Sequence, residues 1–378
     1  MRIALNARIL QAPRTGIGQY VVELVQALRG QDDIELRLFD GWRWGECLPE
    51  ACLPGYGRWS GLIKRCVPGA YALRRWVEQG RFERGVTKRS VDLYHEPSLW
   101  PLAFEGPMVM TLHDLTHVRY PETQPRDRLA EIERHVPRAV ERARRILVDS
   151  QFVADELVDH YGLARKHLVV APLGYSARFH PRETEDLREA LRPFGVLPGR
   201  YLLCVGTLEP RKNLSLVLRA HRRLPVSIRA HYPLLIAGMA GWKSEGFAEE
   251  LAKGMADGGV RLLGYQSDES LAELVAGARM LLFPSLYEGF GLPVLEAMAS
   301  GTPVILTDRS ALPEVAGSAG TYIDADDENV CAEAIRCLIE DEAVWQGKRA
   351  AGLRRAGEFS WRRCAEITVD AYRQALVG

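Results

Sequence analysis

The sequence predicts an α/β protein with two doubly wound domains, each built on a parallel sheet. Short apolar segments alternate with longer segments of helical periodicity, as in strands joined by crossover helices. The alternation is interrupted at 171–200, where four prolines fall in a stretch with few strand signals, and it then resumes. A chain of 378 residues has the length of two ordinary domains, so we expect two sheets facing one another across a cleft.

The first half of the chain, 1–180, is expected to form one domain. Gly16 and Gly18 predict a turn before a helix at 21–28, and Ser150 and Gly162 are typical of the start and the end of a helix. Apolar segments predict strands at 2–6, 35–38, 93–95, 108–112, 146–148 and 168–170.

The second half, 181–358, repeats the pattern, and we place the boundary near residue 180. Strands are predicted at 201–205, 234–237, 261–263, 280–283, 304–306 and 321–323. Helices are predicted at 215–223, 245–255, 269–277, 292–300 and 329–340.

Composition excludes several classes of protein. The chain carries 49 basic and 49 acidic residues, which argues against nucleic acid as a partner. Its seven cysteines are odd in number and scattered without metal-ligand spacing, so we expect a reduced, cytoplasmic setting. The first residues contain no signal-peptide core, and no run of about 18 apolar residues predicts a membrane-spanning helix.

One segment, 58–89, departs from this charge balance. Nine basic residues stand there against Glu78 and Glu83, which gives a net charge of +7, and aromatic and aliphatic residues lie between the charges. Such a segment can bind the surface of an anionic membrane. It can equally form amphipathic helices that pack on their own domain, and both interpretations stay open.

The segment 284–304 constrains function most tightly. Gly289 and Gly291 flank Phe290 directly after a predicted strand, and a helix is expected to begin at Leu292. Free backbone N–H groups at such a turn suit a phosphate. Glu288 before the turn and Glu296 in the helix are suited to accept hydrogen bonds from sugar hydroxyls. A solvated pair of glutamates is the alternative, which the apolar neighbours of Glu296 disfavour.

A basic turn, 206–213, follows the first strand of the second half. Arg211 and Lys212 there can clamp a diphosphate, one as a planar fork and one as a point charge. An exposed basic turn is the alternative. The expected proximity of this turn to the glutamate segment favours binding.

Polar residues also follow strands of the first half. His113 is a candidate to bond a sugar hydroxyl or the transferring group, with Asp114 orienting it. His95 is a weaker candidate for contact with an acceptor. The glycines Gly16 and Gly18 let the backbone approach a phosphate, although Val21 stands where a dinucleotide fingerprint has its third glycine.

Taken together, the chain resembles the retaining GT-B glycosyltransferases of family four, which include lipopolysaccharide and O-antigen mannosyltransferases. The resemblance covers essentially the whole length. Its motifs occur in the family's order: TGIGQY, TLHD, APLGYSARFHP, GTLEPRKN and EGFGLPVLEAMASGTPV. It implies two Rossmann-like domains and a final segment, 359–378, whose helix crosses back to the N-terminal domain. The N-terminal domain is then expected to bind the acceptor and the C-terminal domain the nucleotide sugar.

The resemblance also implies residue roles. Glu296 would hold the ribose, Glu288 the donor sugar and Lys212 the diphosphate with help from Arg211. His113 matches a histidine near the donor sugar, and Asp114 and His95 remain acceptor candidates. Thr207, after Gly206, replaces an arginine that many members carry. Further donor contacts are implied for the backbone around Gly289, Phe290, Gly291 and Leu292, and for Tyr265 beneath the base.

The implied reaction is front-face transfer of a hexose with retention, from GDP-mannose or another GDP-sugar to a lipid-linked glycan. We expect no cofactor and no metal, because Asp324 and Asp326, which resemble a metal-binding pair, are explained by the start of the helix after them. A cytoplasmic enzyme, peripheral on the inner face of the membrane, would fit. A nucleotide-sugar epimerase and a catalytically silent nucleotide-sugar-binding partner are the alternatives.

Overall fold

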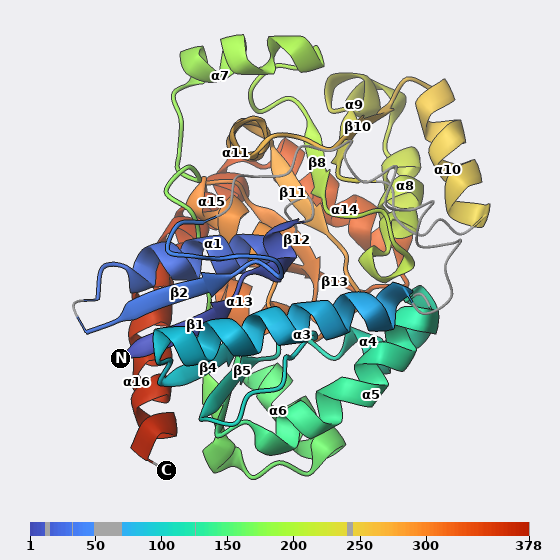
Figure 1. The fold of residues 1–378 in the computed structure, drawn as a ribbon. Helices are drawn as coiled ribbons and strands as arrows, with labels where there is room; N and C mark the ends of the chain where they lie inside the picture. The colour runs from blue at the N-terminus through green and yellow to red at the C-terminus, as the bar shows by residue number, and fades with distance from the viewer. Residues whose placement is uncertain (12–15, 32, 49–69, 125, 240–244, 378) are drawn as a thin grey trace. The chain divides into compact units, whose positions relative to one another are not determined.

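The computed structural model describes residues 1–11, 16–31, 33–48, 70–124, 126–239 and 245–377. The chain divides into two compact units (Figure 1). Unit 1 comprises Met1–His117, Gln124–Leu173 and Trp361–Gly378; unit 2 comprises Val118–Thr123 and Gly174–Ser360. The division thus falls at Leu173 and Gly174 rather than near residue 180.

Unit 1 is built on a sheet of seven strands among the residues described. In spatial order they are β3 (Trp44–Gly45), β2 (Glu35–Phe39), β1 (Arg2–Asn6), β4 (Leu93–Glu96), β5 (Met108–Thr111), β6 (Arg145–Val148) and β7 (Leu168–Val170). Every pairing is parallel except that of the edge strand β3 with β2. The strand order reverses between β1 and β4, which is where an open parallel sheet leaves a crevice at its carboxyl edge.

Crossover helices connect these strands. They are α1 (Gly16–Leu28), α3 (Ala70–Arg89), α5 (Arg126–Arg142) and α6 (Gln151–Tyr161), with short turns at η1 (Arg8–Gln11) and η3 (Arg165–His167). Between β5 and α5 the chain also forms α4 (Thr116–Arg119), which begins in unit 1, and η2 (Pro121–Thr123), which belongs to unit 2. Helix α6 confirms the predicted caps, because Ser150 accepts a bond from the Val153 N–H and Gly162 adopts a left-handed conformation.

The last helix, α16 (Trp361–Val377), belongs to unit 1. It contacts α1, β5 and β6, and Figure 1 shows it in red beside the blue α1. Its apolar stripe, which includes Ala365, Val369 and Tyr372, is buried. The segment that ends the sequence therefore completes the core of the unit that begins it.

Unit 2 contains a sheet of six parallel strands, as far as it is described. Their order is β10 (Val260–Gly264), β9 (Leu234–Ala237), β8 (Leu202–Val205), β11 (Met280–Phe283), β12 (Val304–Thr307) and β13 (Thr321–Ile323). The inner strands β9, β11 and β12 are buried along their whole length, as expected for a sheet covered on both faces. Here the order reverses between β8 and β11.

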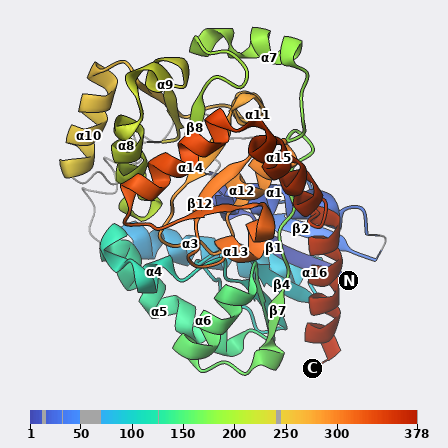
Figure 2. The ribbon, with the colours of Figure 1, turned by 180° about the vertical axis from the view of Figure 1, so that it is seen from behind.

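Helices cover this second sheet, and Figure 2 shows α14 and α15 on it from behind. They are α7 (Thr184–Leu191), α8 (Leu214–Arg223), α9 (Val226–His231), α10 (Glu245–Ala256), α11 (Asp268–Gly277), α12 (Leu292–Ala299), α13 (Leu312–Ala316), α14 (Glu328–Glu340) and α15 (Glu342–Ala356). Short turns lie at η4 (Arg192–Phe194), η5 (Pro210–Lys212) and η6 (Gly317–Ala319). The predicted α/β class with two doubly wound sheets is confirmed.

The predictions from sequence were wrong on some local elements. Helix α1 begins at Gly16, so Gly16 and Gly18 lie in its first turn and not in a turn that precedes it. The proline-rich stretch 171–200 contains α7, which packs on α11 through Leu187 and Leu191. Helices α5 and α15 were not predicted. No helix within the described ranges is both long and apolar enough to cross a membrane.

Candidate active site

The crevice between β8 and β11 of unit 2 gathers the main candidate residues. The turn after β8 carries Gly206 and Thr207 and leads into η5, where Arg211 and Lys212 lie. The segment after β11 carries Glu288. A backbone bond from the Leu286 N–H to the Arg211 carbonyl, 2.8 Å, joins the two segments. The strand-order reversal therefore brings residues 76 positions apart into one crevice.

The side chains of this crevice form a charged cluster. Lys212 Nζ lies 2.6 Å from Oε1 of Glu288, and Arg211 Nη1 lies 3.0 Å from Oε2 of the same carboxylate. Arg211 Nη2 also pairs with Glu209 Oε1 at 2.5 Å, and Nη1 donates to the Tyr287 carbonyl. The four charged side chains are largely buried and balance two positive charges with two negative ones.

The charges of this cluster keep Glu288 ionised. Burial raises the pKa of a carboxyl group, but the positive charges of Lys212 and Arg211 outweigh it and hold the pKa of Glu288 at about 2. Backbone bonds fix the segment as well, since the Glu288 N–H donates to Ser310 Oγ at 2.9 Å. Glu288 is thus a fixed carboxylate that can accept hydrogen bonds but cannot donate a proton near neutral pH.

Close backbone packing sets the shape of the turn at Gly206. A Cβ added to Gly238, at the end of β9, would lie 1.8 Å from the Gly206 carbonyl oxygen, so only glycine fits there. Gly206 itself has a φ of +139°, and its Cα faces the Lys212 side chain, with Cε 3.4 Å from an added Cβ. Sequence reasoning missed Gly238 and Glu209. The signal for Gly238 was its position directly after a buried strand. The signal for Glu209 was an acidic residue inside the basic turn.

The glycine turn before α12 holds the second glutamate. Gly291 has a φ of +107° and caps α12, which begins at Leu292. An added Cβ on Gly291 would lie 2.8 Å from Leu312 Cδ2, so a side chain there would be crowded as well as strained. Phe290 is buried against Phe359, with ring centroids 5.9 Å apart. Glu296 lies within α12 and is 9% exposed, in keeping with a carboxylate that is not merely solvated.

His113 lies after β5 at the carboxyl edge of the unit 1 sheet. Its Nδ1 is 2.7 Å from Asp149 Oδ2, and its Nε2 donates to the Pro97 carbonyl at 3.2 Å. Both nitrogens face acceptors, which favours the imidazolium form. Burial lowers the pKa of His113, but the Asp149 carboxylate outweighs that effect, so the pKa is raised. Tyr20 packs edge-on against the ring at 4.5 Å.

Two further residues of unit 1 have local partners. Asp114 Oδ1 accepts the N–H of Thr116, the first residue of α4, at 2.9 Å. Asp149, which was not predicted as a site residue, is 3% exposed and holds His113. Its position directly after β6, before the cap Ser150, was the signal that could have identified it.

The acceptor role predicted for His95 is at odds with the structure. The residue is fully buried in unit 1, its Nδ1 bonds Tyr372 Oη at 2.7 Å, and its Nε2 bonds Thr111 Oγ1 at 2.8 Å. Burial lowers the pKa of His95 to about 3, so the ring is neutral. Because both nitrogens are occupied inside the core, no polar atom of the side chain faces a ligand. His95 joins α16 to the sheet instead.

The remaining candidates are Tyr265 and the aspartates after β13. Tyr265 follows β10 and is 40% exposed, so its ring is accessible. Asp324 Oδ1 accepts the Asp326 N–H at 2.9 Å, and Asp326 pairs with Arg309 at 3.0 Å. Asp327 caps α14 through the backbone of Asn329 and Val330. No group of three or more metal-ligating side chains occurs among the residues that the structure covers.

Comparison with known proteins gives two family matches. A model described as glycosyl transferases group 1 matches residues 192–358, and one described as Glycosyltransferase Family 4 matches residues 14–179. The chain is 32% identical over 381 residues to O-antigen chain mannosyltransferase B of Escherichia coli, covering 99% of this chain and 100% of that one. It is 30% identical to D-inositol 3-phosphate glycosyltransferase of Pseudarthrobacter chlorophenolicus, over 87% of this chain and 78% of the other.

Solved structures with the same architecture include more distant proteins. Sucrose-phosphate synthase from Thermosynechococcus elongatus superimposes with a TM-score of 0.74 at 22% identity, covering 100% of this chain and 99% of that one. Anabaena HepE in complex with UDP-glucose gives a TM-score of 0.74 at 16% identity, with 99% of each chain covered. At these identities the likeness shows the fold.

Proposed function

Because the chain belongs to the family-four glycosyltransferases and has their GT-B fold, as its sequence predicted, we propose that it transfers mannose from GDP-mannose, or a related hexose from a GDP-sugar, to a hydroxyl of a lipid-linked glycan. The reaction would retain the anomeric configuration and serve O-antigen or related polysaccharide assembly. Its glycosyltransferase activity follows from the family itself. The name of the Escherichia coli relative, with matched length and 32% identity, supports mannose as the sugar.

The cluster of Lys212, Arg211 and Glu288 carries the proposal. Two cationic side chains at a strand-order crevice suit a diphosphate, and a fixed carboxylate beside them suits the hydroxyls of the sugar attached to it. When a donor binds, its diphosphate takes over contacts to Lys212 and Arg211. The Glu288 carboxylate then accepts hydrogen bonds from the sugar, and the positive charges stabilise the diphosphate as it leaves.

Retention without a covalent intermediate fits this charge arrangement. A departing diphosphate gains negative charge while the acceptor hydroxyl loses its proton, so the leaving oxygen can take that proton on the face where the acceptor attacks. The protein then supplies orientation and charge stabilisation. Because Arg211 and Lys212 provide two positive charges at this position, the proposed reaction needs no metal.

The other donor contacts extend the same assignment. Glu296 would bond the ribose hydroxyls from α12, and the backbone N–H groups at the start of that helix would face the phosphates. Tyr265, with its exposed ring after β10, would lie beneath the base. His113 would act as an imidazolium donor, with Nδ1 held by Asp149 and with Nε2 exchanging the Pro97 carbonyl for the sugar or phosphate.

Association with a membrane surface is a second proposal, supported by α3. Its Trp76 is 74% exposed, and Arg84 and Lys88 are exposed on the same helix. An exposed indole among basic side chains suits the interface of an anionic membrane. The rest of the basic segment, 58–69, lies outside the described residues. Sedimentation with phosphatidylglycerol vesicles tests the proposal, and no binding at low salt would contradict it.

A donor screen tests the enzymatic proposal directly. Thermal unfolding is measured with GDP-mannose, GDP-fucose, UDP-glucose and ADP-glucose, with and without a chelator. GDP-mannose should give the largest rise in melting temperature, because a ligand that binds only the folded state stabilises it. NMR of the product formed with a lipid-linked glycan fraction then gives the anomeric configuration. A larger rise with UDP-glucose would contradict GDP-mannose as the donor. A product with inverted anomeric configuration would contradict the retaining mechanism. Loss of activity with the chelator, restored by manganese, would contradict the metal independence.

A further inference from the structure

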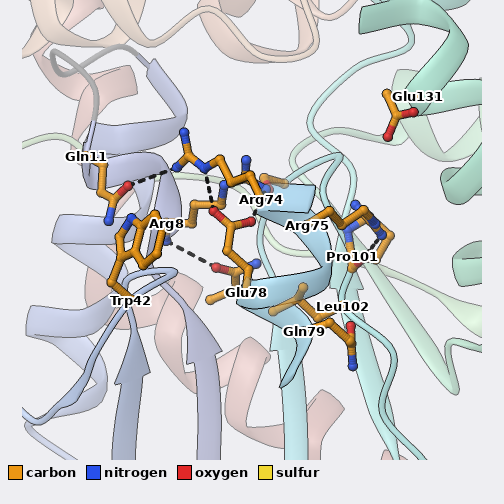
Figure 3. A network of polar contacts seen from close by, with 12 residues as sticks. Arg8, Gln11, Trp42, Arg74, Arg75, Glu78, Gln79, Pro101, Leu102 and Glu131 are labelled. Atoms are coloured by element: carbon orange, nitrogen blue, oxygen red, sulfur yellow. Dashed lines mark hydrogen bonds and ion pairs between the residues drawn. The ribbon is translucent and has the colours of Figure 1, made fainter. Parts of the chain in front are cut away.

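Three arginines of unit 1 define an arginine cluster: Arg8 and Arg74 pair with the buried Glu78, and Arg75, next to Arg74 on the same helix, points toward Pro101 (Figure 3). Arg8 lies in η1, directly after β1, and the others lie near the start of α3, the helix that leads into β4. The cluster is therefore at the carboxyl edge of the first sheet, where the strand order reverses between β1 and β4. Ligands of open α/β sheets bind at that position.

The cluster carries an excess of positive charge. The Glu78 side chain is completely buried, with Oε2 3.0 Å from Arg8 Nη1 and Oε1 2.7 Å from Arg74 Nε. Arg75 donates from Nη2 to the neutral Pro101 carbonyl at 2.6 Å. These four side chains hold three positive charges and one negative charge, and the Glu131 carboxylate, which acts on Arg75, reduces the excess to one. The balanced cluster of unit 2, by contrast, has two of each.

Neighbouring groups hold the guanidinium planes in place. Arg74 Nη2 donates to Gln11 Oε1 at 3.1 Å, and its guanidinium lies 6.0 Å from the Trp42 ring centroid. The Arg8 guanidinium lies 5.7 Å from the Trp100 ring centroid. Side chains held in this way lose less rotamer entropy when they bind a ligand.

The environment of Arg75 favours an anion. Burial lowers the pKa of the Arg75 guanidinium; Glu131 raises it by a smaller amount, and the charge of Arg8 lowers it, so the net direction is downward. A partly buried cation beside another cation is stabilised by a negatively charged ligand. Planar guanidinium groups bond phosphate oxygens in pairs, so phosphate fits this cluster better than a single carboxylate would.

We propose that the arginine cluster binds a phosphate or diphosphate group of the acceptor. The proposal rests on the proposed transfer to a lipid-linked glycan, and it names the anionic group of that acceptor as the part that unit 1 recognises. Trp42, 40% exposed beside Arg74, offers an indole face against which an adjoining sugar ring can stack. The subsite is separate in sequence and in residues from the diphosphate site proposed at Lys212.

Isothermal titration with inorganic diphosphate, in a buffer without divalent cations, tests the proposal. All proteins carry Lys212→Gln, which removes the lysine of the donor site. In that background Arg75→Gln should weaken diphosphate binding about tenfold or more, because charge-assisted bonds are lost. Arg84→Gln, which removes an exposed charge from the same helix, should change the affinity by less than about twofold. Arg75→Lys should fall between Arg75→Gln and the parent.

The outcomes separate phosphate recognition from a membrane contact and from a loss of structure. Equal affinity in the parent and Arg75→Gln, with circular dichroism showing both folded, would overturn the proposal. Weaker sedimentation of Arg75→Gln with phosphatidylglycerol vesicles, at unchanged diphosphate affinity, would also overturn it, in favour of a membrane contact. If Arg75→Gln fails to fold, Arg74→Gln takes its place. Equal diphosphate affinity in Arg74→Gln and Arg84→Gln would then overturn the proposal. The titration involves no donor and no transfer, so a wrong donor assignment leaves its result unaffected.

Discussion

Lys212 Nζ lies 2.6 Å from Glu288 Oε1, which joins the turn after β8 to the segment after β11. Both side chains are more than four-fifths buried, and Arg211 approaches the other oxygen of the same carboxylate. Breaking a buried pair by removing one partner leaves a charge without compensation. The contact therefore matters for stability without a donor and, in the proposed reaction, for catalysis with one.

We predict that Glu288→Gln lowers kcat/KM for transfer by a factor on the order of 100 to 1,000, because the sugar hydroxyls lose a charged acceptor. Lys212→Ala should instead raise the donor KM about tenfold or more and slow departure of the diphosphate. Steady-state kinetics on both variants, with circular dichroism as the fold control, measure these effects.

A surface pair provides the matched control. Lys253 and Glu249 on α10 are also 2.6 Å apart, but both are more than half exposed. Lys253→Ala should change neither kinetic constant and should alter stability by less than about 1 kcal/mol. Wild-type rates for both Glu288→Gln and Lys212→Ala would contradict the assignment of the site.

The low pKa of Glu288 gives a stability prediction with a definite sign. A folded-state pKa of about 2 lies below the unfolded value, so the charged carboxylate stabilises the fold above pH ~4.3. The shift is worth on the order of 3 kcal/mol, and it is lost as the pH falls from ~4.3 toward 2. The destabilisation of Glu288→Gln relative to wild type should therefore be largest at pH 7 and shrink toward pH 3. Urea unfolding at pH 7, 5, 4 and 3 measures it; a difference that grows on acidification would contradict the charge state.

Gly238→Ala should destabilise unit 2 by about 1–3 kcal/mol or more, because its Cβ would lie 1.8 Å from the Gly206 carbonyl oxygen. The turn that carries Lys212 would shift, so transfer should fall as well. Gly347→Ala on α15 is the control, since an added Cβ there meets no described atom within 4 Å, and alanine should stabilise that helix by about 0.5–1 kcal/mol. Scanning calorimetry on both variants tests the pair, and equal melting temperatures would contradict the close packing.

The strands were predicted well because buried strands consist of short runs of apolar residues, which can be recognised in the sequence. The segments 234–237 and 280–283 coincide with β9 and β11, since the inner strands of a parallel sheet are apolar on both faces. The segment 321–323 coincides with the edge strand β13, in which Ile323 is buried and Tyr322 is exposed. Helix α7 was missed because the prolines around it obscured its eight residues. Position after a strand likewise predicted which residues approach the crevices, as with Lys212 and Glu288.

Side-chain direction and distant partners could not be predicted in this way. His95 stands at a strand end, yet its ring points into the core toward Tyr372, 277 residues further along the chain. Successive residues of a strand face opposite sides, so the end of a strand does not determine which side chain reaches a ligand. Asp149 and Gly238 likewise contact residues that follow other strands, His113 after β5 and Gly206 after β8, and a single sequence does not show which residues pair.

The contact between His113 and Asp149 gives a last prediction, in the pH dependence of transfer. Asp149 Oδ2 lies 2.7 Å from His113 Nδ1 and raises the pKa of the imidazole, so the ring keeps its proton to higher pH. If the imidazolium donates to the donor sugar or phosphate, kcat/KM falls as the pH rises through that pKa. Asp149→Asn removes the negative charge, so the alkaline limb of the profile should move to lower pH.

Two controls make the outcome specific to the charge. His113→Gln should flatten the alkaline limb altogether, and Asp114→Asn, beside the ring but bonded to the Thr116 N–H, should shift the limb less than Asp149→Asn. Profiles of kcat/KM from about pH 6 to 10 on the four proteins provide the comparison. An Asp149→Asn profile that falls in amplitude without moving along the pH axis would mean that Asp149 only supports the local fold, because loss of structure scales the rate without changing the imidazole pKa.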